Sequence, residues 1–278
     1  MRSSEQVLQQ ILAFAEADEN IRAMVMNGSR VNPNVVLDVF CDYDILCFVE
    51  DLEKNIRDQS WIPTFGELVI SQFNRHDEYP EEQVIFLMQF SDGVRIDLSF
   101  ATPKMIPIAL EDSLTVVLLD KDQRFPPLPP PSEASYITPR PDQATYDAVV
   151  NEFWWISTYV AKALWRKQWV TAKFFLEGIV RESLNRMVDW FIVMQHGWEI
   201  TAGKMGKRYG EHLPADIYAE LLATYPGIAE EEIWQALFRA GRLMRRLGEA
   251  VGEDLGFVYH VDEDERVMRY LRGVKEKG

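Results

Sequence analysis

Hydrophobic residues recur with two different periods along the first 120 residues of the chain. From Glu5 to about Asn20, apolar side chains are spaced three or four positions apart, which predicts an amphipathic helix. Ser3 and Gln6 fit a capping box at the start of this helix. Five short apolar runs, each typical of a buried strand, follow over residues 21–26, 43–49, 84–90, 94–100 and 115–119. This pattern predicts an α/β or α+β region with four or five strands and two or three helices.

Two dipeptides indicate how these elements connect. Asp92-Gly93 lies between two of the strand-like runs and is a favoured sequence for a tight hairpin turn. Thr102-Pro103 fits the start of a helix, with threonine as the N-cap and proline at the first helical position. We therefore expect an antiparallel hairpin over residues 84–100, followed by a helix.

A cluster of prolines divides the chain. Seven of the 14 prolines lie between Pro126 and Pro141, and such a segment forms neither a helix interior nor a central strand. Seven of the eight tryptophans lie beyond it, and at helical spacing they are expected in a core. Long helical periods follow over residues 146–169, 171–194, 215–224 and 230–252. The sequence therefore predicts a first domain over 1–125, a proline-rich linker over 126–141 and a helical bundle over 142–278.

Charge narrows the possible functions. The 278-residue chain has a formal net charge of −15, and residues 1–140 carry 11 Lys and Arg against 23 Asp and Glu. A nucleic-acid-binding protein needs basic residues opposite the phosphates, so the composition argues against this class. An acidic surface instead favours a cationic partner, or carboxylates that hold a divalent metal ion.

The chain lacks the sequence signals of membrane or secreted proteins. No run reaches 18 apolar residues, and the first five residues have no apolar stretch of a signal peptide, so we expect a cytoplasmic protein. A reducing cytoplasm disfavours a disulfide between Cys41 and Cys47, which are expected to be small buried hydrophobic residues. The four histidines show no metal-ligand spacing with each other or with a cysteine, which argues against a zinc site.

Three aspartates lie where the predicted strands bring them together. Asp42 and Asp44 stand at the mouth of a strand and, being two residues apart, point to the same side. Asp97 lies within a hairpin strand, on the face opposite to Ile96 and Leu98. Converging carboxylates repel one another unless a cation lies between them, and hard oxygen ligands favour Mg²⁺. Asp42, Asp44 and Asp97 are therefore the predicted metal ligands and catalytic residues.

A Gly-Ser turn supplies phosphate-binding groups that complement the predicted metal-binding carboxylates. Gly28-Ser29 ends the first strand about a dozen residues before Asp42. Glycine allows backbone N–H groups to approach phosphate oxygens, and the serine hydroxyl donates a further hydrogen bond. Arg30 is next to this turn and carries the charge to screen a triphosphate. Gly28, Ser29 and Arg30 are therefore the predicted nucleotide-binding residues.

The order of these motifs resembles a known active site. Gly28-Ser29, then Asp42-x-Asp44, then a distal strand aspartate at Asp97, is similar to the pattern of polymerase-β-type nucleotidyltransferases. Four longer stretches resemble the aminoglycoside 6-adenylyltransferase (streptomycin adenylyltransferase) family: NGSRVNP (27–33), DVFCDYDI (38–45), DGVRIDL (92–98) and VLLDKD (117–122). The similarity continues at residues 172–173, 203–204, 232–234 and 255–259, and so covers about residues 1–270. Residues 71–82 and 260–266 depart from the pattern, which leaves the identity of the acceptor open.

The resemblance implies an α+β fold, in which an N-terminal polymerase-β-like mixed sheet with flanking helices is followed by a C-terminal helical bundle. It also implies Mg²⁺-dependent transfer of AMP from ATP to a hydroxyl of a cationic aminoglycoside. The acceptor would be the 6-hydroxyl of a streptomycin-like molecule, and the result antibiotic resistance. Lys173 is then either a ligand that reaches the triphosphate or a solvated helix lysine. Asp97 is either a second-metal ligand or the general base, and Glu182 is an alternative base or acceptor contact.

Two other functions stay open at this point. One is a nucleotidyltransferase of the same fold that acts on another small molecule or on a protein hydroxyl. The other is a catalytically silent member that binds a partner, although three uncompensated acids would lower stability in a protein that binds no metal. The expected partners are ATP and a cationic small molecule, with no nucleic acid and no membrane. A monomer and a weak dimer are both compatible with the sequence.

Overall fold

The structure is a computed structural model that describes residues 2–277. The chain forms two compact units, one ending at Tyr136 and the other beginning at Ile137. Residues 126–136, which the sequence analysis assigned to the linker, belong by their contacts to the first unit. The reason is a set of polar contacts, among them Asn32 and Asn34 to Glu133, that tie the end of the proline-rich segment to this unit.

The first unit is built on a six-stranded mixed sheet of order β3-β4-β5-β2-β1-β6. Strands β2 and β5 pair in parallel, whereas every other neighbouring pair is antiparallel. The hairpin predicted at Asp92-Gly93 is confirmed, because β4 and β5 pair across it. The strands are β1 (Ile21–Asn27), β2 (Tyr43–Val49), β3 (Leu68–Arg75), β4 (Gln83–Phe90), β5 (Arg95–Ala101) and β6 (Thr115–Asp120).

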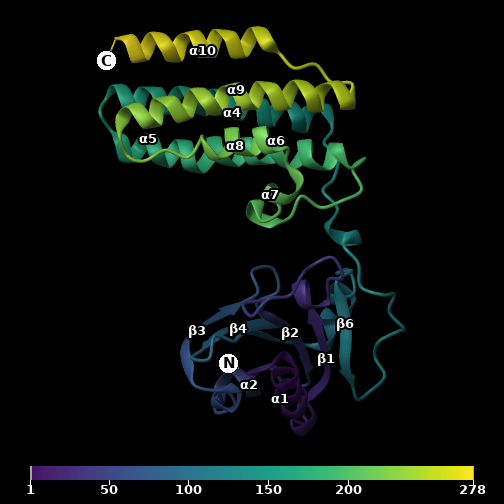
Figure 1. Cartoon of the computed structure of the whole chain (residues 1–278). Coiled ribbons are helices and arrows are strands. Elements are labelled where there is room, and N and C mark those ends of the chain that lie inside the picture. The colour runs from purple at the N-terminus through teal and green to yellow at the C-terminus, as the bar shows by residue number, and fades with distance from the viewer. Residues whose placement is uncertain (1, 278) are drawn as a thin grey trace. The chain divides into compact units, whose positions relative to one another are not determined.

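Helices cover one face of this sheet (Figure 1). Helix α1 (Ser4–Ala17) begins with the predicted capping box, and it buries Val7 and Ile11 in a core shared with Ile45 of β2. Helix α2 (Leu52–Arg57) contributes Leu52 to the same core. On the opposite face a smaller apolar cluster covers one end of the sheet, where Thr102-Pro103 starts a 3₁₀ turn (Pro103–Met105) that leads into α3 (Ile106–Ala109). The same face also carries Asp44 and Asp97, which are in register on β2 and β5.

Strand β3 is absent from the sequence prediction. Seven of its eight residues are exposed, including Val69 and Ile70, because β3 lies at the edge of the sheet with neither face covered. Its side chains therefore have no alternation of buried and exposed positions, which is the signal that identifies a strand in sequence.

The second unit is helical, and its long helices run side by side in Figure 1. Its helices are α4 (Gln143–Trp165), α5 (Trp169–Phe175), α6 (Arg181–Gln195), α7 (Tyr209–His212), α8 (Ala215–Leu222), α9 (Glu230–Leu255) and α10 (Val261–Glu276). The predicted helix over 171–194 is interrupted by a π-helical turn, Leu176–Val180, that separates α5 from α6. Helix α10 was not predicted, because its apolar stripe is narrow and buries only Met268 and Leu271 among apolar residues.

The tryptophans of this unit divide between core and surface. Trp154, Trp190, Trp198 and Trp234 are buried, as predicted, but Trp155, Trp165 and Trp169 are exposed. Adjacent positions on a helix face different directions, so Trp154 and Trp155 cannot both face the core. Among residues 2–277 no helix is both long and apolar enough to span a membrane.

Candidate functional site

A row of polar side chains crosses the open face of the sheet. Asp97 of β5 pairs in register with Asp44 of β2, and Asp44 pairs in turn with Asn27 of β1. Thr115 of β6 continues the row beside Asn27, whose side-chain amide donates to the Thr115 hydroxyl at 2.6 Å. The parallel pairing of β2 and β5 thus brings together two of the aspartates that the sequence singled out. Asp97 is 9% exposed.

The turn after β1 lies against this row. Gly28 begins a 3₁₀ turn, Gly28–Val31, and has a φ of +77°, which side chains other than glycine rarely adopt. A Cβ atom built on Gly28 would overlap Oδ2 of Asp44. The absence of a side chain at this position therefore sets how closely the predicted phosphate-binding turn approaches the Asp44 carboxylate.

Replacing Gly28 with alanine is expected to lower both stability and activity. A positive φ costs alanine about 1–2 kcal/mol, and the added Cβ must also displace the Asp44 carboxylate. We expect the nucleotidyl transfer that the resemblance implies to fall at least about tenfold, because small displacements of a catalytic group slow a reaction strongly. Gly256→Ala is a matched control, since Gly256 has a φ of +74° but no atom within 4 Å of its would-be Cβ. Equal activity of Gly28→Ala and Gly256→Ala would contradict a role for the close approach of Gly28 to Asp44.

Arg95 links two of the predicted carboxylates. Its Nε and Nη2 atoms donate to Asp97 Oδ1 and Oδ2 at 2.8 and 2.7 Å, and its Nη1 atom lies 3.5 Å from Asp42 Oδ2. Hydrogen bonding to Asp97 raises the pKa of Arg95, so the guanidinium stays charged. The repulsion expected between the aspartates is therefore partly offset by a cation of the chain itself.

The residues of this face fit a divalent cation by their chemistry. Asp42, Asp44 and Asp97 offer carboxylate oxygens, which Mg²⁺ prefers, and Gly28 leaves space next to Asp44. Among residues 2–277, however, no group of three or more Asp, Glu, His or Cys is gathered around one point. Arg95 contacts both Asp97 and Asp42, so a cation shared by all three requires this guanidinium to shift. Metal binding by these residues stays a prediction.

Arg30 has contacts that the sequence did not suggest. Its Nε donates to the Asp42 carbonyl oxygen at 3.0 Å and its Nη2 to the Cys41 carbonyl oxygen at 2.8 Å, and its guanidinium lies 3.5 Å from the centre of the Tyr43 ring. Arg30 thus fixes the chain just before Asp42 and Asp44. Phosphate binding by Ser29 and Arg30 stays a prediction.

Three further residues at this site were missed by sequence reasoning. Asp112 Oδ2 accepts a hydrogen bond from the Tyr136 hydroxyl at 2.8 Å and lies 3.4 Å from the Asn27 amide. Burial, together with Asp112 and Asp44, raises the pKa of Tyr136, which places this phenol in the electrostatic field of the site. Asn27 precedes the Gly-Ser turn and was identifiable from that position alone, whereas nothing in the sequence ties Asp112 or Tyr136 to β2.

Lys173 lies in the second unit and is bound within it. Its ammonium donates to the Pro226 carbonyl oxygen at 2.8 Å and pairs with Glu177 at 2.5 Å. These contacts hold the Lys173 ammonium within the second unit, and nucleotide binding by Lys173 stays a prediction. Cys47 in the first unit is buried, as expected, whereas Cys41 is partly exposed.

Glu182 is exposed at the start of α6, beyond the π-helical turn that separates it from Lys173. It lines a hollow of about 330 Å³ together with Asn185 and Asp189. Burial raises the pKa of Asp189 to about 6, although a hydrogen bond from the Tyr209 hydroxyl opposes this effect. The second unit therefore has acidic groups of its own near Glu182.

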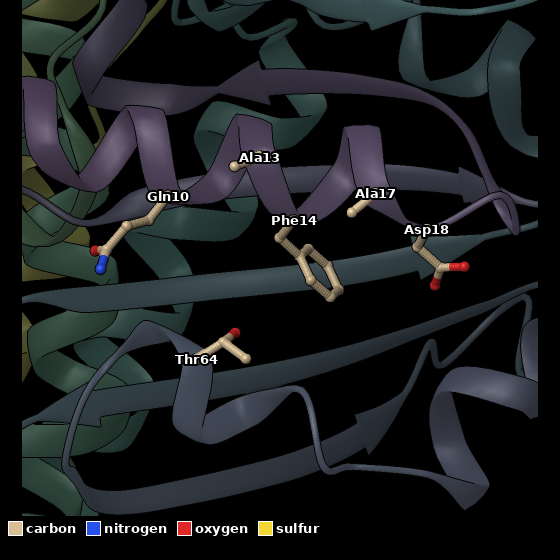
Figure 2. Close-up of a pocket in the computed structure, with 6 residues that line it drawn as sticks. All are labelled: Gln10, Ala13, Phe14, Ala17, Asp18 and Thr64. Carbon is tan, nitrogen blue, oxygen red and sulfur yellow. The ribbon is translucent and has the colours of Figure 1, made fainter.

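A separate hollow lies between α1 and the turn at Thr64 (Figure 2). It is lined mainly by the apolar atoms of Ala13, Phe14 and Ala17, and it contains none of the predicted site residues. Helix α1 packs on the face of the sheet opposite to Asp44 and Asp97, so this hollow is not part of the polar row.

Comparison with known proteins identifies the family of the chain. The family model for streptomycin adenylyltransferase matches residues 1–274. An aminoglycoside 6-adenylyltransferase of Campylobacter jejuni is 34% identical over 281 residues, covering 100% of this chain and 97% of that protein. One from Bacillus subtilis strain 168 is 35% identical, covering 99% and 98%. The crystal structure of an aminoglycoside 6-adenyltransferase from B. subtilis matches with a TM-score of 0.50 at 30% identity over 99% of both chains.

The match spans both units and includes every residue of the polar row. The fold is α+β, with a mixed sheet followed by a helical region, as the sequence predicted. This chain is a nucleotidyltransferase and belongs to the streptomycin adenylyltransferase family.

Proposed function

We propose that this chain transfers AMP from ATP to a hydroxyl of a cationic aminoglycoside, with Mg²⁺ as the metal ion. The observation that supports this most directly is the registered pair Asp44–Asp97 beside the Gly28 turn, in a chain whose relatives are named aminoglycoside 6-adenylyltransferases. From the names of the same relatives, we propose that the acceptor group is the 6-hydroxyl of a streptomycin-like molecule and that the reaction gives antibiotic resistance. Because ATP is the proposed donor, the proposed compartment is the cytoplasm.

Each residue has a distinct role in the proposed reaction. The acceptor oxygen forms a bond to the α-phosphorus while the bond to the β-phosphate oxygen breaks, and pyrophosphate leaves with that electron pair. Asp97 accepts the hydroxyl proton, since each of its oxygens keeps a lone pair besides the one used by Arg95. Gly28 and Ser29 bind the phosphates, assisted by Arg30 and by Lys173 of the second unit.

Asp42 and Asp44 are the proposed ligands of Mg²⁺, with Asp97 as a further one. When bound, the metal ion neutralises charge on the transferred and leaving phosphates. The carboxylates also have a second use, since an aminoglycoside is a polycation. The excess of acid in residues 1–140 attracts such a polycationic acceptor.

A two-part experiment tests this function. ATP with Mg²⁺ is expected to raise the thermal unfolding midpoint, because a ligand at 100 times its Kd stabilises the folded state by about 2.7 kcal/mol. Pyrophosphate release is then measured with streptomycin, other aminoglycosides, neutral polyols and a protein acceptor, and NMR of the product locates the new phosphodiester. Release with polyols or protein alone would favour another acceptor. Stabilisation by ATP without release in any assay would favour a silent binding protein.

A further inference from the structure

The chain between the proline cluster and the second unit is attached to the nucleotide side of the first unit. Residues 133–136 end the first unit and include a short 3₁₀ turn, Ala134–Tyr136. Three side chains of this segment contact two loops of the first unit: Glu133 binds the loop after the Gly-Ser turn, and Ser135 and Tyr136 bind adjacent residues of the loop before β6. We refer to residues 133–136 as the tethering segment.

Glu133 binds the loop that follows the Gly-Ser turn. Its Oε1 atom accepts a hydrogen bond from Asn32 Nδ2 at 2.8 Å, and its Oε2 atom accepts one from Asn34 Nδ2 at 3.0 Å. The backbone N–H of Asn32 in turn donates to the Ser29 carbonyl oxygen at 3.2 Å. A single carboxylate therefore fixes the loop that begins three residues after Ser29.

Ser135 secures the segment to the loop before β6. The Ser113 and Ser135 hydroxyls lie 2.8 Å apart, and the backbone N–H of each residue donates to the hydroxyl of the other at 3.0 and 2.9 Å. Ser132 adds a backbone hydrogen bond to the Ser113 carbonyl oxygen at 3.0 Å. These reciprocal contacts define one position for the segment, because each serine binds the other's backbone.

Tyr136 is linked to the polar row through Asp112. Its hydroxyl donates to Asp112, Asp112 lies beside the Asn27 amide, and Asn27 is the cross-strand partner of Asp44. The partly buried phenol stays protonated and so remains a donor, because burial and the nearby carboxylates raise its pKa. Tyr136 is therefore connected to the Asp44 end of the row through the Asp112 and Asn27 side chains and the pairing of β1 with β2.

We propose that the tethering segment positions the nucleotide site: Glu133 holds the phosphate-binding turn in place through Asn32 and Asn34, and Tyr136 holds the row beside Asp44 through Asp112. Both are positioning residues, since neither has to touch the reacting atoms. The inference rests on the proposed use of ATP. It also gives the end of the proline-rich segment a role in the reaction, in addition to that of a connection.

The first test replaces Glu133 with glutamine in the full chain. The amide keeps one acceptor oxygen but places an NH₂ group opposite an asparagine amide, so one of the two contacts is lost. Because hydrogen bonds to charged groups are the stronger ones, we expect the KM for ATP to rise about five- to tenfold, with kcat within about twofold. Glu50→Gln is the matched control, since Glu50 is an exposed residue of the same unit that pairs with Arg124.

A double-mutant cycle with Asn32→Ala separates positioning from general damage. If Glu133 acts through Asn32, the double variant is expected to have nearly the same KM as Glu133→Gln alone. Multiplication of the two single effects would overturn this part of the inference. Glu133→Asp, which keeps the charge on a shorter side chain, is expected to recover part of the ATP affinity.

The second test replaces Tyr136 with phenylalanine, which keeps the ring and removes the hydroxyl. We expect kcat to fall about tenfold with an unfolding midpoint close to that of the unchanged chain, because Asp44 loses orientation and not its charge. Tyr79→Phe is the control, since Tyr79 lies beside His76 at the β3–β4 turn.

The outcomes distinguish this inference from the proposed function. If the unchanged chain neither binds ATP with Mg²⁺ nor releases pyrophosphate, the proposed function fails and the inference fails with it. If the unchanged chain is active but Glu133→Gln and Tyr136→Phe match their controls in KM and kcat, only the inference is overturned. A fall in the unfolding midpoint of both variants with unchanged KM and kcat would also overturn it, since that result assigns the segment to stability alone.

Discussion

The Asp44→Asn variant is expected to lose adenylyl transfer by about 10³-fold or more, as for removal of a main electrostatic stabiliser. Asp44 is the proposed Mg²⁺ ligand at the centre of the polar row, between Asp97 on one side and Asn27 on the other. An amide ligates Mg²⁺ poorly, and the row offers no other carboxylate on β2 facing Asp97. Asp42→Asn is expected to have a comparable effect, because Asp42 shares the proposed metal.

The thermal unfolding midpoint distinguishes loss of catalysis in Asp44→Asn from misfolding. Removing one of two facing carboxylates relieves repulsion, so the unfolding midpoint of Asp44→Asn without metal is expected to stay the same or rise. Asp122→Asn serves as the control, because Asp122 pairs with Arg22 and Arg124 away from the row. Pyrophosphate release above a tenth of the unchanged rate in Asp44→Asn or Asp42→Asn would contradict the metal assignment.

Asp97→Asn is expected to slow the chemical step by about 10²–10⁴-fold, the range for loss of a general base. We expect the affinity for ATP with Mg²⁺ to change little, because Asp42 and Asp44 suffice for the triphosphate-bound metal. The acidic limb of the pH–rate profile should disappear, because the variant lacks the proposed acceptor of the hydroxyl proton. The measurement takes ATP affinity and single-turnover rate separately across pH.

A suitable control for Asp97 exists in the same hairpin. Asp92 is also an aspartate paired with an arginine, Arg2, but it lies at the turn. Asp92→Asn is therefore expected to lose an ion pair without slowing the chemical step. If ATP affinity collapses in Asp97→Asn while the pH limb persists, Asp97 is a metal ligand only. Partial recovery of Asp97→Asn activity with Mn²⁺ would also identify Asp97 as a metal ligand. Glu182 would then be the next candidate for the general base.

The sequence predicted most of the elements that have a covered face. Strands β1, β2, β4, β5 and β6 were found from their apolar runs, and the Asp92-Gly93 turn from its dipeptide. Edge strand β3 has no buried face and so produced no alternating signal. Helix α10 does have an apolar stripe, formed by Val261, Val267, Met268, Leu271 and Val274, which the prediction overlooked. The π-helical turn at Leu176–Val180 contains Glu177 and Gly178 but no proline, so the predicted helix was continued through it.

At the site, local motifs were predictable but contacts between distant segments were not. Gly28 and Asp44 belong to motifs with characteristic spacing, and the structure brings them together. The pairing of Arg95 with Asp97 follows from two positions on one strand face, although its second contact with Asp42 does not. Tyr136 lies about 90 residues from the strand that it influences, and no periodicity relates such positions.

The parallel pairing of β2 with β5 determines when the site can form during folding. Asp44 and Asp97 face each other only after β5 has passed back beside β2, and the two residues are roughly fifty positions apart with the hairpin strands β3 and β4 between them. Antiparallel neighbours such as β4 and β5 pair across a short turn. The β2–β5 pair instead requires closure of a long loop, whose entropy is lost before the stabilising contacts form. The carboxylate pair is thus a product of late, nonlocal closure. A nascent chain that has not yet emerged past Ala101 contains the Gly-Ser turn and Asp44 but has no assembled site.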